Sequence, residues 1–165
     1  MKVLLFNGGP HEKGCVYTAL AEIAATLKLE DVESQYYWLG NKAIHGCMSC
    51  WGCVDKGKCV IDDQVNEFVA LAVKADGFVF GSPVHYASAC GASCAFLDRV
   101  FFSSQNHKGG PVFYLKPAAA VISARRAGTT AAFDRLNKYF AISQMPIISS
   151  CYWNMVHGYT PDDVQ

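Results

Sequence analysis

Short apolar runs of strand length alternate along the chain with segments in which apolar residues recur at helical spacing. The first run, residues 2–6, stops at Asn-Gly-Gly-Pro, which is typical of a buried strand entering a turn. The next segment, residues 16–29, places Leu20, Ile23 and Leu27 on one face of a helix. The strand runs are too apolar to expose one face to water. The alternation therefore predicts an α/β fold, a parallel sheet with helices on both faces.

Five strands are expected, with a helix between each pair of consecutive strands. We expect the strands at residues 2–6, 34–38, 77–81, 118–123 and 146–150. We expect the helices at residues 16–29, from Asp62 or Asp63 onward, at residues 89–103, and from Thr129 or Thr130 onward. A further helix would normally cover the last strand. Either this C-terminal helix is missing from residues 1–165 or a partner subunit covers that surface.

The size and charge of the chain limit its class. Its 165 residues suit a single domain, and 52% of them are hydrophobic, enough for a core without disulfides. Fourteen basic residues balance fourteen acidic ones, which disfavours a nucleic-acid or membrane-surface partner. No apolar stretch reaches the length of a membrane span, and the N-terminus lacks the pattern of a signal peptide. We therefore expect a cytoplasmic protein.

Half of the eight cysteines lie in one loop, residues 45–61, with the spacing Cys47-x2-Cys50-x2-Cys53-x5-Cys59. Four thiolates on a short flexible loop can hold a [4Fe–4S] cluster or a tetrahedral zinc ion. Four-cysteine zinc sites more often pair two Cys-x2-Cys units across a longer spacer. The remaining alternative is that the thiols carry no metal, and that they stay free or form a disulfide.

Three loops follow the carboxyl ends of expected strands, at residues 7–15, 82–88 and 124–128. In open α/β sheets this edge is where ligands bind. The first loop leads into a helix, whose free N–H groups and partial positive charge suit a phosphate. It matches neither the Walker pattern nor the Gly-x-Gly-x-x-Gly dinucleotide pattern. No Gly-x-Ser-x-Gly motif of a hydrolase is present in the sequence.

These loops resemble the NADPH-dependent FMN reductase and iron–sulfur flavoprotein family, whose first loop reads Asn-Gly-Ser-Pro-Arg-x-x-Gly-Asn-Thr. The chain keeps Asn7, Gly8, Pro10 and Gly14 of this motif. It differs in having Gly9 for Ser, His11 for Arg, and Cys15-Val16 for Asn-Thr, which removes two hydroxyl donors and a permanent charge. A weaker hold on the FMN phosphate is expected.

The second and third loops extend the resemblance. Gly81-Ser82-Pro83-Val84-His85-Tyr86 is similar to the family's isoalloxazine-binding segment, and Ala124-Arg125-Arg126-Ala127-Gly128 to the stretch beside the flavin. We expect the backbone of the third loop to contribute more to flavin binding than the guanidinium group of Arg125 or of Arg126. The FMN-binding residues that the resemblance implies are Gly9, Pro10, His11, Gly14, Cys15, Val16, Tyr17, Ser82, Pro83, Val84, His85, Tyr86, Ala124, Arg125, Arg126 and Gly128.

The resemblance also carries expectations about fold, cofactors and partners. It implies a flavodoxin-like three-layer sandwich with strand order 2-1-3-4-5, and an FMN-dependent oxidoreductase that takes electrons from NAD(P)H or another donor. In iron–sulfur flavoproteins a loop like 45–61 holds a [4Fe–4S] cluster near the flavin, which implies Cys47, Cys50, Cys53 and Cys59 as ligands. A homodimer or homotetramer is expected. The alternatives are an electron carrier of the flavodoxin type, which is usually more acidic, and a flavin-free metal-binding module.

Overall fold

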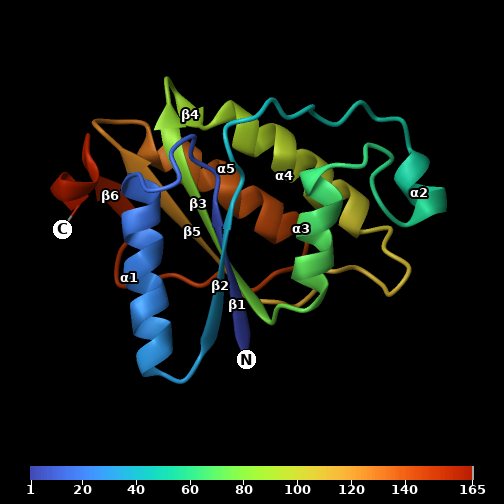
Figure 1. Cartoon of the computed structure of the whole chain (residues 1–165), viewed down its shortest axis with the longest axis horizontal. Coiled ribbons are helices and arrows are strands. Elements are labelled where there is room, and N and C mark those ends of the chain that lie inside the picture. The colour runs from blue at the N-terminus through green and yellow to red at the C-terminus, as the bar shows by residue number, and fades with distance from the viewer. Residues whose placement is uncertain (165) are drawn as a thin grey trace.

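A computed structural model describes residues 1–164, in which strands and helices alternate as the sequence predicts (Figure 1). The strands are β1 (Lys2–Asn7), β2 (Glu33–Trp38), β3 (Gly77–His85), β4 (Ser88–Ala89), β5 (Ala118–Ala124) and β6 (Met155–His157). The helices are α1 (Cys15–Leu29), α2 (Gly52–Lys56), α3 (Gln64–Val73), α4 (Gly91–Ser104) and α5 (Thr129–Ile142), followed by a 3₁₀ turn, η1 (Pro161–Val164). Within residues 1–164, no helix is long and apolar enough to cross a membrane.

The sheet has the strand order β2-β1-β3-β5-β6, and all of these neighbours are parallel. This order is the 2-1-3-4-5 arrangement of the flavodoxin-like fold, which confirms the predicted fold class. The short strand β4 pairs antiparallel with the end of β3 and makes a sixth strand. It was not predicted, because two residues are too few to produce an alternation pattern.

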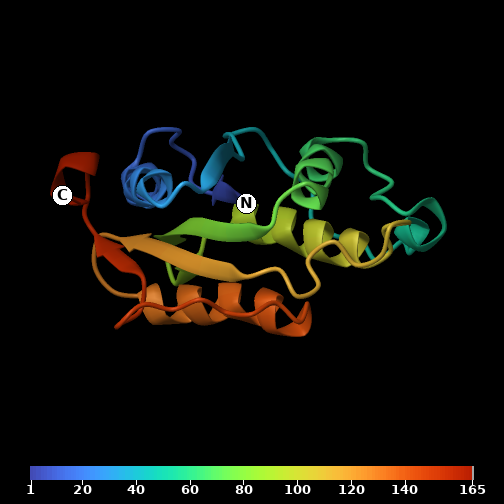
Figure 2. The same ribbon diagram turned by 90° about the horizontal axis from the view of Figure 1, so that it is seen from below.

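The two faces of the sheet carry different helices. Leu5 on β1 packs with Val16 and Leu20 of α1, whereas its neighbours Leu4 and Phe6 pack with residues of α3, α4 and α5. Successive strand residues point to opposite faces, so this alternation defines the layers. Figure 2 shows α1 and α5 on opposite sides of the sheet. The structure is therefore a three-layer sandwich with helices on both faces.

The larger core, on the side of α3, α4 and α5, is built from phenylalanines. The ring of Phe6 lies against those of Phe68, Phe80 and Phe96, with centroid distances of 5.3 to 5.7 Å. All four side chains are fully buried, and each contributes about 1.5–3 kcal/mol of transfer free energy. This core fixes the strand ends from which the loops of the site emerge.

The last predicted strand is wrong. Residues 146–150 form only an isolated bridge between Ile147 and Ala118, and the fifth parallel strand is β6, at Met155–His157. After the bridge, Ser149, Ser150 and Cys151 are exposed, so the apolar pair Ile147-Ile148 does not continue into the sheet. The short α2 inside the cysteine loop was not predicted either, because its five residues show no helical period.

Tyr37 on β2 leads to a prediction about alkaline stability. Its ring stacks in the core beside Phe6 and Phe68, and burial, assisted by the carboxylates of Glu67 and Asp63, raises its pKa to about 12. In the unfolded chain a tyrosine ionises near pH 10. The stabilising effect of the neutral phenol is thus complete below pH 10 and is lost as the pH rises toward 12.

We expect the free energy of unfolding to fall between pH 10 and 12, and to fall less steeply in Tyr37→Phe. Chemical denaturation at a series of pH values measures both slopes. Tyr86→Phe is the matched control, because Tyr86 is fully exposed, and its slope should equal that of the wild type. A Tyr37→Phe protein with the wild-type slope would contradict the prediction.

Candidate functional site

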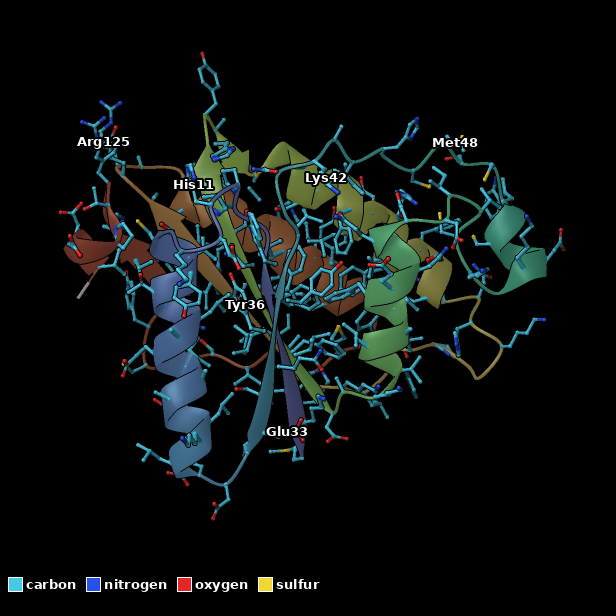
Figure 3. The ribbon with its side chains drawn as sticks, in the orientation of Figure 1. His11, Glu33, Tyr36, Lys42, Met48 and Arg125 are labelled. Atoms are coloured by element: carbon cyan, nitrogen blue, oxygen red, sulfur yellow. The ribbon has the colours of Figure 1, made fainter. Side chains whose placement is uncertain are left out.

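A cavity of about 490 Å³ lies at the carboxyl edge of the sheet. This volume falls within the range of small-molecule and cofactor sites. All three loops that the sequence analysis selected contribute to its lining, together with the segment after β6. Figure 3 shows His11 and Arg125, from the first and third loops, at this edge. The lining residues are Gly9, Pro10, His11, Lys13, Gly14, Cys15, Val16, Pro83, Val84, His85, Ser123, Ala124, Arg125, Gly158, Tyr159 and Pro161.

The N-terminus of α1 opens into this cavity. Gly14 is the N-cap, and it provides no side-chain hydrogen bond to the first turn. The first N–H groups of a helix have no partner within the helix, so those of the first turn are available to a ligand. No acidic residue lies in that turn. The backbone here forms an anion-binding cradle.

The charged residues that line the cavity are cationic. Lys13 and Arg125 line it, and no Asp or Glu appears among its lining residues in the described chain. The histidines His11 and His85 also line it. The cavity therefore suits an anionic ligand, and its apolar walls at Pro83 and Val84 suit a flat apolar group.

Polar side-chain groups of β1 and β2 hold the first loop in place through hydrogen bonds. The Asn7 side chain accepts a hydrogen bond from the Gly9 N–H (2.9 Å) and donates to the Tyr36 hydroxyl (2.7 Å). Tyr36 donates to the carbonyl of Glu12 (2.8 Å), and the Trp38 indole donates to the carbonyl of Gly9 (2.9 Å). These bonds fix the carbonyls on the inner side of the loop. The sequence analysis selected neither Tyr36 nor Trp38, although the polar tip of each aromatic side chain was a usable signal.

The second loop is a tight hairpin between β3 and β4. Ser82 is fully buried, and its Oγ accepts a hydrogen bond from the Cys90 N–H (3.1 Å). Tyr86 has a φ of 63° and is fully exposed. Of the predicted residues, Pro83, Val84 and His85 line the cavity, whereas Ser82 supports the hairpin and Tyr86 points into solvent. Because Tyr86 lies in the turn of the hairpin, its side chain is directed away from the cavity.

The third loop contributes Ser123, Ala124 and Arg125 to the cavity. The Arg125 guanidinium lies over the ring of Tyr159, 4.8 Å from its centroid. Gly128 is the N-cap of α5 with a φ of 100°, and a Cβ there would approach Val84 to 2.9 Å. Gly128 is thus needed for the close packing of two loops, and it does not line the cavity.

Eleven of the sixteen predicted flavin-site residues line the cavity and five do not. The five outside it are Tyr17, Ser82, Tyr86, Arg126 and Gly128. The lining residues that the prediction omitted are Lys13, Ser123, Gly158, Tyr159 and Pro161. Three of these follow β6. They were missed because the last strand was predicted too early in the chain.

The four cysteines of loop 45–61 line a second, narrow cavity of about 20 Å³. Burial raises the pKa of the Cys53 thiol, and the neighbouring thiols of Cys50, Cys59 and Cys47 raise it further. Within residues 1–164, no three His, Cys, Asp or Glu side chains are arranged around a single ion, and no disulfide links them. The donor set suits a thiolate-ligated cluster. Cys47 and Cys50 are exposed, whereas Cys53 is buried and Cys59 is half-buried.

The two cavities lie at opposite ends of α4. The helix begins at Gly91, beside the second loop, while Arg99, Phe102 and Ser103 near its other end line the cysteine cavity. Fourteen helical residues span about 20 Å. Figure 3 likewise places Met48 of the cysteine loop far from His11 and Arg125. Within one chain the cysteines are therefore not beside the flavin-sized cavity, which differs from the arrangement that the resemblance implied.

Comparison with known proteins gives one family. The sequence model of the NADPH-dependent FMN reductase family matches residues 1–160 of this chain. An iron–sulfur flavoprotein of Methanocaldococcus jannaschii is 28% identical over 153 residues, which cover 90% of this chain and 76% of that protein. An iron–sulfur flavoprotein of Clostridioides difficile is 27% identical over 130 residues, 77% of this chain and 56% of that protein.

Solved structures agree on the fold. A flavone reductase superposes with a TM-score of 0.73 at 18% identity, covering 98% of this chain and 55% of that one. A flavodoxin from the domain Archaea gives a TM-score of 0.62 at 16% identity, covering all of this chain and 90% of that one. The chain thus spans only about half the length of some relatives it matches. Because the family model covers nearly all of its residues, the chain belongs to the NADPH-dependent FMN reductase family.

Proposed function

We propose that the chain is an FMN-dependent oxidoreductase, with FMN bound in the cavity at the carboxyl edge of the sheet. The observation that carries this proposal is the convergence of three loops on one cavity that combines an uncapped helix N-terminus with a cationic, acid-free lining. In this proposal the N–H groups of Cys15 and Val16 hold the phosphate and Lys13 neutralises it. When bound, FMN supplies reversible transfer of one or two electrons.

The remaining walls orient the ligand and exclude water. In this proposal Pro83 and Val84 present an apolar surface to one side of the isoalloxazine ring, and Ala124 leaves room for close approach of the backbone. Arg125, stacked on Tyr159, adds a second positive charge to the wall of the cavity. Membership of the family supports NAD(P)H as the electron donor.

We further propose a [4Fe–4S] cluster on Cys47, Cys50, Cys53 and Cys59. The compact spacing, the common cavity and the relatives named iron–sulfur flavoproteins support it. When bound, such a cluster stores and passes single electrons. A single zinc ion is less well supported, because four-cysteine zinc sites more often pair two Cys-x2-Cys units across a longer spacer. The exposed rings of Tyr152 and Trp153 support the further proposal of a homodimer or homotetramer, since exposed aromatics favour interfaces.

The test is anaerobic purification followed by an absorption spectrum and by iron, sulfide and flavin analysis. We expect protein treated with FMN to bind one flavin per chain, and NADPH to bleach its absorption under anaerobic conditions. Protein that binds FMN but is not reduced by NADPH would indicate an electron carrier. Protein that remains colourless in excess FMN would contradict the proposal.

A further inference from the structure

Arg99, on the buried face of α4, is the largest fully buried side chain of the described protein, with 2% of its surface exposed. It is the only charged residue in the buried part of residues 1–164. Burying a guanidinium is costly unless its donors are all used and its charge is balanced. A side chain of this kind in the wall of the cysteine cavity calls for a functional explanation.

The partners of Arg99 join both ends of the cysteine loop to the core. Its Nη1 and Nη2 donate to the two carboxylate oxygens of Asp63, at 2.7 and 2.8 Å. Nη1 also donates to the carbonyl of His45 and Nη2 to that of Ile61, both at 3.2 Å. His45 opens the loop and Ile61 closes it, so Arg99 fixes the two points between which the four cysteines lie.

Arg99 also contacts one of the proposed ligands directly. Its Nε and Nη2 donate to the Cys59 sulfur at 3.4 and 3.3 Å. Two N–H groups of one fixed cation therefore converge on a sulfur that, in the proposed function, binds iron. Hydrogen bonds to the ligand sulfurs and nearby charge are among the factors that set the reduction potential of an iron–sulfur cluster.

Resting on the proposed function, we propose that Arg99 is a positioning residue that holds Cys59 for the cluster and raises the cluster's reduction potential. Adding an electron makes the cluster more negative. A cation that donates hydrogen bonds to its sulfur favours the reduced form more than the oxidised form. Asp63, as the counter-ion of Arg99, limits this effect.

The pair allows a test in which two substitutions act in opposite directions. Arg99→Met removes the cation and both N–H···S bonds at similar side-chain volume, so it should lower the potential. Asp63→Asn removes the anion but keeps Arg99 on Cys59, so it should raise the potential. Asparagine is also a good N-cap, so α3, which Asp63 caps through the Val65 N–H, should be retained.

The measurement is a dithionite titration of the cluster, followed by electron paramagnetic resonance, in wild type and variants reconstituted anaerobically with iron and sulfide. We expect Arg99→Met to lower the equilibrium constant for one-electron reduction at least tenfold, which is about 59 mV. We expect Asp63→Asn to shift it in the opposite direction, and Arg99→Lys to shift it less than Arg99→Met does. Arg135→Met is the control, because Arg135 pairs with Asp98 on the surface and does not line the cavity of the four loop cysteines.

The outcomes separate the two levels of the proposal. Wild-type protein that takes up no iron overturns the cluster proposal, and the role of Arg99 with it. A full cluster whose potential is the same in Arg99→Met and wild type overturns the role of Arg99 alone. Shifts of the same sign in Arg99→Met and Asp63→Asn also overturn it, since they would indicate a general loosening of the loop. If Arg99→Met fails to fold, Asp63→Asn and Arg99→Lys still decide the question.

Discussion

Replacing Lys13 and Arg125 together by glutamate is expected to lower the affinity for FMN about 100-fold and to leave the affinity for riboflavin nearly unchanged. These two side chains are the charged groups among the lining residues of the cavity. A hydrogen bond to a charged group contributes about 1.5–3 kcal/mol to the free energy of binding, and a change of about 1.4 kcal/mol alters the dissociation constant tenfold. Both side chains are exposed, so we expect the lower end of this range for each. Riboflavin lacks the phosphate and should not respond.

Fluorescence titration with each flavin at low and high salt measures the difference. The effect should shrink as ionic strength rises, because exposed charges are screened. Arg126→Glu is the matched control, since Arg126 is an exposed neighbour of Arg125 that does not line the cavity. Equal losses for FMN and riboflavin would show that the two charges do not act on the phosphate, and would remove the main argument for its position at the N-terminus of α1.

The first four parallel strands were predictable, whereas the last was not, and the reason lies in how each strand is stabilised. β1, β3 and β5 are buried on both sides, so their apolar runs are long and unbroken. β6 is a three-residue edge strand, Met155–His157, whose residues are only half-buried or exposed. The run at 146–150 is more apolar, yet it pairs only through Ile147. The other edge strand, β2, was predictable because Tyr36, Tyr37 and Trp38 follow one another in it. Hydrophobicity alone cannot identify an edge strand as short as β6.

The candidate site was predictable in its position but not in its details. The rule that ligands bind at the carboxyl ends of parallel strands selected all three loops that line the cavity. The direction in which a side chain points depends on tertiary structure, which the sequence does not reveal directly. For this reason the sequence analysis did not foresee that Tyr86 points into solvent and that Gly128 packs against Val84. Arg99 carries no motif, so its link to Cys59, 40 residues away in the chain, became visible only in the structure.

Cys53→Ala is expected to remove most of the iron from anaerobically reconstituted protein, while FMN binding stays at the wild-type level. Cys53 is the most buried of the four loop cysteines, with 6% of its surface exposed, and its sulfur accepts a bond from the Asn106 amide. Without it, the exposed thiols of Cys47 and Cys50 remain open to competition from water. Alanine fits the space and favours the helix α2, so the loop itself should persist.

Cys90→Ala provides the matched control, because Cys90 is equally buried at 6% and lies outside the loop. We expect about four irons and four sulfides per chain in wild type and in Cys90→Ala, as a [4Fe–4S] cluster requires. Retention of all the iron in Cys53→Ala would exclude Cys53 as a ligand. A parallel loss of FMN would contradict the separation of the two sites along α4, since a ligand lost at one end of that helix should leave the cavity at its other end intact.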